Sequence, residues 1–405
     1  MCHKGRLYTG ESRKLLSFTG NAPIEVSRQE KEVLRCNTCS IEFMSHVKNP
    51  VKWDNTARSS IVLQKVHGIP FYRLSKLQSL YNIPVAPSTL WLQCLGLWLE
   101  CGYYIYKQLL SLAAECKVFY LDDTGAKILE VIDTNKSLPA KQQRSCHTTG
   151  ICSETLEGHK LIIYITDNKY CGENFAPILE SRENKEHYIK IVTDASSQNT
   201  PKVDEATLKK VIQSNCLAHG RQKFYDLKGN HPKECEYFLN EISAIYKVEK
   251  ECQDYCTRKK LRCHKTGSSQ PIRNIYTKIR YLFKEKLVEP NSDLGKAMNY
   301  WLRHKKELTR FLRVKGIKLD TNWVERALKS IILQRKNSLF FKTRNSAEIL
   351  SGLHSIVKTC EENKVNAFAY LNWIQQNSTI IEKGKVDYMP WDYLAYMNST
   401  ELIAA

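Results

Sequence analysis

Three acidic residues stand apart from their surroundings in this chain. Asp122 closes the apolar run VFYLDD, Asp194 closes IKIVTD, and Glu325 lies in the segment DTNWVERALKSIIL. A carboxylate at a strand end can reach the crevice at the edge of a sheet. Two Mg²⁺ or Mn²⁺ ions held by such carboxylates can activate a nucleophile and stabilise the leaving oxygen of a phosphodiester. The pattern fits two-metal phosphodiester chemistry, although strand-end aspartates are also common turn formers.

Asp123 directly follows Asp122 and is an alternative first carboxylate. Side chains alternate between the two faces of a strand, so the two aspartates are expected to point to opposite faces. Only one of them can therefore face the other two acids, and we keep Asp123 as the fallback.

The charge of the chain favours a polyanionic partner. The 405 residues carry 61 Lys and Arg against 42 Asp and Glu, a net charge of +19, and the length indicates two or three domains. Residues 299–345 hold 13 Lys or Arg against three acids, beside several aromatic residues. We expect this stretch to bind DNA phosphates rather than to form only a solvated face. The candidate contacts are Lys305, Lys306, Lys315, Lys318, Arg326, Lys329, Arg335 and Lys336.

Two cysteines near the start of the chain have the spacing of a zinc knuckle. Cys36 and Cys39 lie in LRCNTCSIEF, and Cys2 could add a third ligand for Zn²⁺. The alternative is that they are incidental thiols in a chain with 15 cysteines. The sequence has neither a secretory signal at its start nor an apolar run of membrane-spanning length, so we expect reduced thiols and a cytoplasmic, nucleoid-associated protein without a membrane partner.

Two further groups of metal-ligating residue types are interpreted as structural. Cys216 and His219 in NCLAHG have too few neighbouring ligands for a metal, so a buried histidine hydrogen-bonded near the active site is expected. A long helical segment contains Cys252, Cys256, Cys263 and His264. One helix cannot wrap four ligands around an ion, so these residues are expected to lie on helix faces.

The periodicity predicts which elements position these residues. Residues 56–115 read as three helices with a proline-bearing turn before the third, which Ser88 would cap, in an arrangement like a helix-turn-helix. Four strands are then expected, in the segments CKVFYLDDTG, AKILEVID, HKLIIYITDN and YIKIVTDAS, with a helix in ENFAPILESRE before the last. Helices are expected in ATLKKVIQS, NCLAHGRQKFYDL and most of the remaining chain. The fold class is α/β with a mixed sheet.

Longer segments resemble a known family. LDDTGAKIL, TDASSQNTPK, NCLAHGRQKFYDL and NWVERALKSIILQRKNSLFFKTRNSAEI occur in family order and resemble the bacterial DDE transposases of the insertion sequence 66 family. The resemblance implies a ribonuclease H-like core interrupted by a helical insertion, with Asp122, Asp194 and Glu325 as the metal-binding triad. It also implies cleavage at the ends of a mobile element, transfer of the 3′ hydroxyl to target DNA, and a homo-oligomer on that DNA.

The resemblance also implies a division of the chain and raises an alternative function. We expect a partial zinc-ribbon-like segment at 1–50, a helical DNA-binding-like segment at 51–115, the core at 116–228 and 301–378, the helical insertion at 229–300, and a tail at 379–405. The family's first knuckle has two cysteines and this chain starts at the second, Cys2, so we expect a truncated member. The alternative function is a descendant that binds DNA without catalysis.

Overall fold

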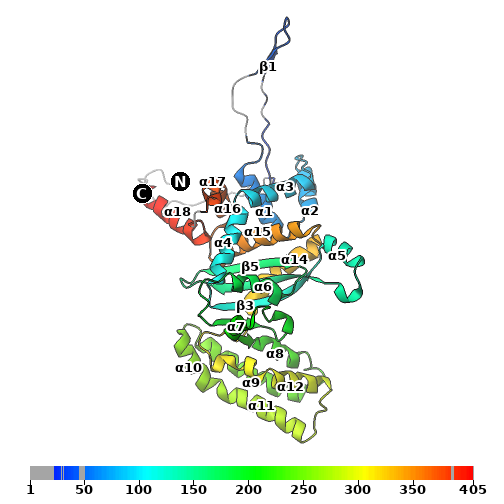
Figure 1. The fold of residues 1–405 in the computed structure, drawn as a ribbon, viewed down its shortest axis with the longest axis vertical. Helices are drawn as coiled ribbons and strands as arrows, with labels where there is room; N and C mark the ends of the chain where they lie inside the picture. The colour runs from blue at the N-terminus through cyan, green and yellow to red at the C-terminus, as the bar shows by residue number, and fades with distance from the viewer. Residues whose placement is uncertain (1–21, 29, 31, 45–50, 385–386, 405) are drawn as a thin grey trace, which may run out of the picture.

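The computed structural model describes residues 22–28, 30, 32–44, 51–384 and 387–404. A central sheet separates two helical regions along the long axis of the molecule, and a small hairpin of β1 (Val33–Arg35) and β2 (Glu42–Met44) extends from one end (Figure 1). Within the described residues, no helix combines the length and apolarity needed to cross a lipid bilayer.

The central sheet has five strands in the order β5-β4-β3-β6-β7. The strands β3 (Val118–Ala126), β4 (Cys146–Glu154) and β5 (Lys160–Asp167) pair antiparallel, whereas β6 (Ile189–Thr193) and β7 (Val211–Asn215) continue the sheet from β3 in parallel. The expected α/β class with a mixed sheet is therefore confirmed.

One face of the sheet packs against helices from both ends of the chain. Its buried residues include Phe119, Leu121 and Ile191, and they share a core with the surrounding helices. These elements are α1 (Asn55–Val66), α3 (Pro87–Leu97), the π-helical turn η1 (Trp98–Gly102), α4 (Tyr103–Ala114), α6 (Cys171–Glu180), α15 (Arg344–Glu362), α16 (Ala367–Gln376), α17 (Ser378–Glu382) and α18 (Pro390–Ala404).

Helix α15 also closes the edge of the sheet at β5. The backbone N–H groups of Ile162 and Tyr164 donate hydrogen bonds to Thr359 Oγ1 at 3.2 Å and Ser355 Oγ at 2.8 Å. An exposed edge strand would offer unpaired backbone groups to other chains. Side chains of α15 satisfy these groups, so this edge is covered within the chain itself.

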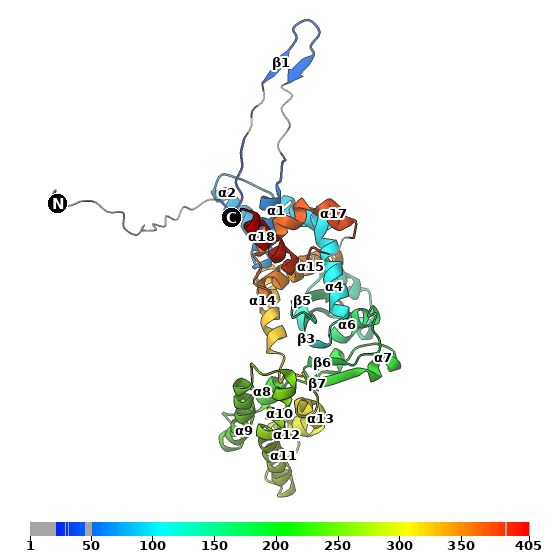
Figure 2. The ribbon, with the colours of Figure 1, turned by 90° about the vertical axis from the view of Figure 1, so that its left-hand side faces the viewer.

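The opposite face packs against α14 (Asn322–Ser338) and a helical lobe. Tyr120, Cys152 and Val192 of this face share a core with both. The lobe contains α8 (Leu217–Tyr225), α9 (Pro232–Glu251), α10 (Thr257–Gly267), α11 (Ser269–Lys284), α12 (Asp293–Arg303), α13 (Lys305–Leu308) and η4 (Arg310–Leu312). Helix α14 runs from the lobe toward the N-terminal helices (Figure 2).

The remaining elements are α2 (Phe71–Leu80), whose Leu74 joins the same core as α1 and α3, and short connecting elements. The connecting elements are α5 (Leu129–Lys136), η2 (Ala140–Gln142), η3 (Ser197–Asn199) and α7 (Glu205–Lys209).

Several predicted elements differ in the structure. The segment AKILEVID was expected as a strand but forms α5, and β4 was not predicted. The expected helix in ATLKKVIQS divides into α7 and β7. Ser88 does not cap the third helix, because α3 begins at Pro87 with Ala86 as its N-cap. Pro87 suits the first helical turn, where a missing N–H costs nothing.

Candidate active site

The parallel pairing of β3 and β6 places two of the predicted acids next to each other. The register pairs Phe119 with Ile191 and Tyr120 with Val192. Continuing it by two residues sets Asp122 beside Asp194. Both aspartates follow Tyr120 and Val192 on the face that packs against α14 and the lobe.

Helix α14 supplies the third acid from above this face. Glu325 lies in its first turn, and Val324, Leu328 and Ile331 form the buried stripe that packs the helix on the sheet. Glu325 is at the margin of this stripe, as its sequence position predicted. Its Oε1 accepts a hydrogen bond from Thr321 Oγ1 at 2.9 Å.

A glycine of β4 allows α14 to lie close to the sheet. Gly150 pairs with Asp122 across the antiparallel ladder. A Cβ on Gly150 would lie 2.9 Å from two Leu328 atoms and 3.0 Å from Val324 Cγ2. The helix that carries Glu325 can therefore approach Asp122 this closely only because position 150 has no side chain.

The three acids interact electrostatically. Burial, with smaller contributions from the charges of Asp194 and Glu325, raises the pKa of Asp122 to about 6 against a hydrogen bond from the Asp123 N–H and the charge of His219. Carboxylates gathered in this way repel one another and attract a cation. The structure therefore brings the three predicted acids into one site.

The neighbouring hydrogen bonds distinguish the aspartates. Asp194 Oδ1 accepts bonds from the Ser196 N–H, at 2.9 Å, and from the Asn199 side-chain amide. Asp123 points to the opposite face, where it accepts bonds from Thr149 Oγ1 at 2.6 Å and the Cys171 N–H at 2.7 Å. The carboxylate of Asp123 is thus engaged in packing α6 on the sheet, which favours Asp122 as the first acid.

Cys216 and His219 lie beside Glu325, at the start of α8. One ligand atom from each of the three residues lies within 4.8 Å of the others, and His219 Nδ1 is 3.8 Å from Glu325 Oε1. The Cys216 side chain raises the pKa of His219 to about 9 against the effect of burial, and Glu325 and Asp122 contribute. A protonated His219 partly compensates the negative charge of the acids. The histidine was expected to be buried and hydrogen-bonded, but its side chain is 37% exposed and its Nδ1 has no hydrogen-bond partner among the described residues.

Glu325 lies at the edge of a cavity of about 480 Å³ between α8, α9 and the start of α14. Glu325, His219, Arg221 and Tyr246 are among its lining residues. A substrate can therefore reach Glu325 from the side of the lobe.

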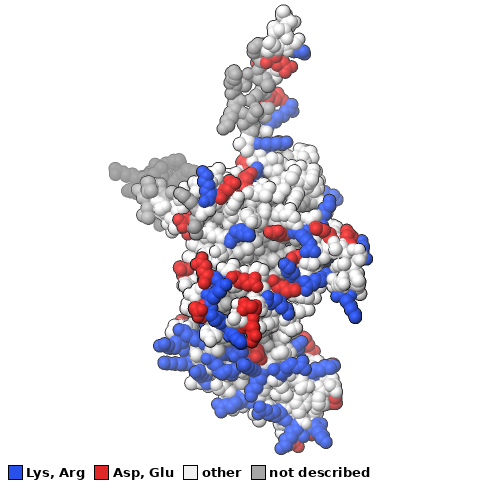
Figure 3. All heavy atoms as spheres, in the orientation of Figure 1, with Lys and Arg blue, Asp and Glu red and all other residues white. Residues whose placement is uncertain are grey.

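The predicted DNA-contacting cations are available for a ligand. Seven of the eight are exposed, and Arg335 is half-buried. None of the eight forms an ion pair within the described part of the chain. Lys and Arg side chains gather over the helical lobe on the face seen in Figure 3. This surface suits phosphate groups, whose binding releases counterions.

The donors at the acidic site fit a hard divalent cation. Asp122, Asp194 and Glu325 offer carboxylate oxygens, which Mg²⁺ and Mn²⁺ prefer, whereas the neighbouring sulfur of Cys216 is a soft ligand. Burial, and secondarily the neighbouring acids, disfavour the ionised form of Asp122, which a bound cation would stabilise. The residues present therefore match the predicted cofactor class.

The zinc prediction rests on Cys36 and Cys39, because Cys2 lies outside the described residues. Cys36 occupies the turn of the hairpin, where the backbone N–H groups of Cys39 and Thr38 lower its pKa to about 7. A thiolate is the form that binds zinc. Neither cysteine belongs to a group of three or more ligands in the part of the chain that the structure describes.

A second ligand cluster joins two helices of the lobe. Glu249, Cys252 and His264 come together because the predicted single helix breaks between α9 and α10. Glu249 already pairs with Lys260 at 2.5 Å and His264 at 2.7 Å. These two partners compensate the charge of Glu249 without a metal. A structural role for the cluster is therefore still favoured, although the residues come from two helices and not from one as expected.

Sequence reasoning missed three residues that support the acids. Thr321 bonds Glu325, Asn199 bonds Asp194, and Gly150 admits α14. The only available signal was TDASSQN, whose polar residues after an apolar strand could have indicated a cage around Asp194.

Comparisons with known proteins identify the family of this chain. Residues 52–349 match the Transposase IS66 family. Among curated proteins, the chain is 29% identical over 185 residues to the uncharacterized protein y4jD of Sinorhizobium fredii, covering 44% of this chain and 36% of that protein. It is 28% identical over 190 residues to y4qI of the same organism, covering 44% and 34%. The chain thus spans about a third of the length of these relatives. The family match covers most of the chain, which therefore belongs to the IS66 family of transposases.

Proposed function

We propose that this chain is a DDE transposase that cuts DNA at the ends of a mobile element and joins the freed 3′ hydroxyl to target DNA. The observation that carries the proposal is the convergence of Asp122, Asp194 and Glu325 on one face of the sheet. Membership of a transposase family supports DNA as the substrate.

The proposed fold of the core is ribonuclease H-like, with the lobe helices inserted before α14. The strand order β5-β4-β3-β6-β7, in which only β4 runs antiparallel to its neighbours, supports this assignment. In this fold the acids from β3, β6 and α14 would form a single catalytic centre.

Asp122, Asp194 and Glu325 would hold two Mg²⁺ or Mn²⁺ ions. When bound, such ions activate the attacking hydroxyl and stabilise the leaving oxygen. Residues of the chain prepare the site: Asn199 fixes the rotamer of Asp194, Thr321 orients Glu325, and protonated His219 offsets part of the negative charge. The eight predicted DNA-contacting cations, which form no ion pair among the described residues, would hold the DNA backbone.

The test is Mg²⁺-dependent cleavage of duplex DNA that carries an element end. Asp122→Asn, Asp194→Asn and Glu325→Gln should each abolish cleavage and leave DNA binding largely intact, because the acids hold metal and the Lys and Arg side chains hold phosphate. Asp123→Asn is the matched control and should retain activity if it folds. Cleavage at the wild-type rate by any of the three variants would remove that residue from the triad.

The second candidate function is DNA binding without catalysis. The set of unpaired cations favours it, because these side chains bind phosphates whether or not the acids hold metal. A wild-type chain that binds the element end but does not cut it with Mg²⁺ or Mn²⁺ would support this function.

A further inference from the structure

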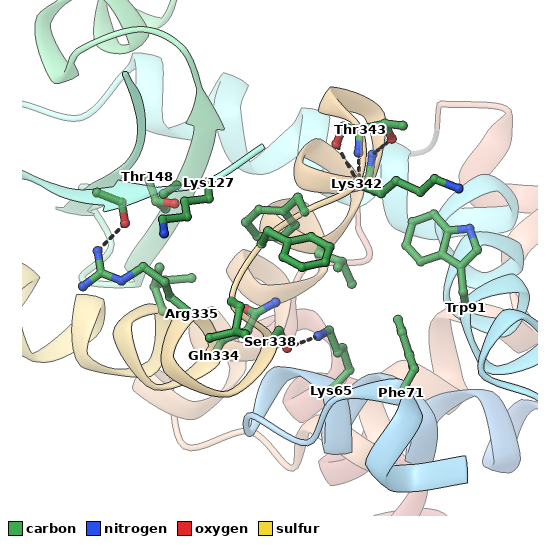
Figure 4. A pocket seen from close by; sticks show the side chains of 18 residues that line it. Lys65, Phe71, Trp91, Lys127, Thr148, Gln334, Arg335, Ser338, Lys342 and Thr343 are labelled. Atoms are coloured by element: carbon green, nitrogen blue, oxygen red, sulfur yellow. Dashed lines mark hydrogen bonds between the residues drawn. The ribbon is translucent and has the colours of Figure 1, made fainter. Parts of the chain in front are cut away.

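A second cavity, of about 430 Å³, lies between the N-terminal helices and the far end of α14. Its size falls in the range of about 300–1,000 Å³ that is typical of ligand pockets. Phe71 and Trp91 reach it from α2 and α3, Gln334 and Arg335 from α14, and Lys127 from the end of β3 (Figure 4). No part of the proposed triad lines it.

The cavity is positively charged. Lys65, Lys127, Arg335 and Lys342 line it, and no acidic residue is among its described lining residues. Lys65 is only 5% exposed, and its Nζ donates a hydrogen bond to Ser338 Oγ at 2.7 Å. It forms no ion pair within the described residues, and burial lowers its pKa to about 8. A buried cation without a counterion is costly, so a ligand with acceptor atoms would stabilise it.

The cavity is also aromatic. Phe71 and Trp91 pack edge to face with ring centroids 6.3 Å apart, and Phe340 and Phe341 line the cavity from the segment after α14. Phe340 is 48% exposed, although it borders this hollow. Aromatic faces beside cations are the elements with which proteins bind unstacked bases.

A strained turn holds Phe340 at the rim. Leu339 has a φ of +64°, and the Phe340 N–H donates a hydrogen bond to the carbonyl oxygen of Ser338 at 2.8 Å, which makes this a γ-turn of the rare strained type. Phe341 then pairs with Ile128 in a short parallel bridge. Strained backbone often occurs where a ligand is clamped.

The position of the cavity connects it to the acids. Gly125 lines the cavity and lies three residues after Asp122 on the same strand, which corresponds to about 10 Å. This equals the rise of about three stacked nucleotides in B-form DNA. Arg335 of the cavity lining donates hydrogen bonds to Thr124 Oγ1, at 3.1 Å, and to the carbonyl oxygen of Gly125, so it joins the cavity to the strand that carries Asp122.

We propose that this cavity receives one nucleotide that is unpaired and rotated out of the DNA within about three positions of the cut. The proposal rests on the proposed function. The base would stack on Phe340 and the neighbouring aromatic rings, and the backbone phosphate would contact Arg335 and Lys127. Taking a base out of a duplex costs stacking and pairing energy, which the cavity would offset.

Lys65 defines the expected base preference. Its ammonium group has three donors and no acceptor, and Ser338 engages one of the donors. A base edge rich in acceptors, such as guanine with O6 and N7 or thymine with O4, would satisfy another. Adenine and cytosine present amino donors beside their acceptors and would bind less well.

The experiment compares fully paired element ends with ends that carry a single mismatch at each of the three positions on either side of the cut. We expect Phe340→Ala to slow Mg²⁺-dependent cleavage of paired ends about tenfold and to slow cleavage of the correctly mismatched end much less, because that nucleotide is already unpaired. Lys65→Met should remove the preference for guanine or thymine at this position. Phe368→Ala, at a 39% exposed phenylalanine outside the cavity, is the matched control.

Binding of the same duplexes without metal, measured by fluorescence anisotropy, separates this inference from the proposed function. The wild type should bind the mismatched end more tightly than the paired end, and Phe340→Ala should lose the difference even if no variant cuts DNA. Equal losses on both kinds of DNA, no loss on either, or a change in the number of chains per DNA would overturn the inference. The last result would make the cavity an interface between copies of the chain.

Discussion

Asp122→Asn should make the metal-free protein more stable at neutral pH while it abolishes cleavage. The pKa of Asp122 rises from 3.8 to about 6 in the folded chain because of burial and the charges of Asp194 and Glu325. A raised folded-state pKa means that the stabilising contribution is fully present below pH 4 and is lost as the pH rises through 6. The shift of about 2 pH units corresponds to at most about 3 kcal/mol.

The assay is urea denaturation of the metal-free wild type and the Asp122→Asn variant between pH 4.5 and 8. The variant keeps an oxygen that can accept the Asp123 N–H, now 2.9 Å from Asp122 Oδ1, so it loses the charge and little else. We expect the variant to gain about 1–3 kcal/mol over the wild type at pH 8 and only about a third of that at pH 4.5, where Asp122 is protonated in the folded wild type but largely ionised in the unfolded chain. Adding Mg²⁺ at ten times its Kd should stabilise the wild type by about 1.4 kcal/mol and the variant much less.

Asp123→Asn provides the control with the opposite sign. The Asp123 carboxylate accepts two hydrogen bonds, from Thr149 and from the Cys171 N–H, and an amide has only one oxygen to replace its two. Burial also raises the pKa of Asp123, against these two bonds, so removing its charge offsets part of the loss. This variant should therefore lose up to about 1–3 kcal/mol of unfolding free energy, and less at pH 8 than at pH 4.5. If Asp122→Asn destabilises the protein equally at pH 4.5 and pH 8, electrostatic crowding of the acids is refuted.

Three further predictions concern Gly150 beside the acids, the exposed lysines and the cysteines of the hairpin. Gly150→Ala should lower the free energy of unfolding by about 1–3 kcal/mol and slow cleavage by up to about 100-fold, because the new methyl group displaces α14 and Glu325. Thermal unfolding and cleavage rates check this. Gly229→Ala is the control, because a Cβ at Gly229 would meet open space. Replacing Lys305, Lys306, Lys315 and Lys318 together with Gln should weaken binding to all DNA sequences alike and flatten the log–log salt slope by about 0.9 per lost phosphate contact; an unchanged slope would mean that these side chains do not touch DNA. Chelation of zinc should leave the unfolding midpoint unchanged, because the described residues of the Cys36 hairpin are largely exposed; a fall of several degrees on adding chelator would contradict this.

The elements that carry the three acids could be predicted because their signal is local. Asp194 directly follows β6 and Glu325 borders the apolar stripe of α14, as expected, whereas Asp122 lies inside β3 and not at its end, because the strand continues through polar residues to Ala126. The strand β4 was missed because CHTTGICSE is rich in polar residues and contains a glycine. In the structure Thr148 and Thr149 are buried and hydrogen-bonded to Thr166 and Asp123, partners that lie far away in the sequence.

The second cavity could not have been predicted, because the residues that line it are far apart in the sequence. Lys65, Gly125 and Phe340 come from three separate parts of the chain and meet only when α14 crosses the sheet. The segment AKILEVID misled for a related reason: its β-branched residues favour a strand, yet Ile128 pairs with Phe341 and the chain then turns into α5. Tertiary contacts outweighed local propensity at this point.

Helix α14 contributes residues to both the acidic site and the second cavity. Glu325 lies in its first turn and Arg335 near its last, ten residues apart and therefore about 15 Å along the axis. Strand β3 connects the same two places through Asp122 and Gly125. Two rigid elements that each reach both sites keep the distance between them constant. A change such as Gly150→Ala, which tilts α14 at one end, should therefore disturb nucleotide capture as well as cleavage, whereas Phe340→Ala should leave the acids and the stability of the metal-free protein unchanged.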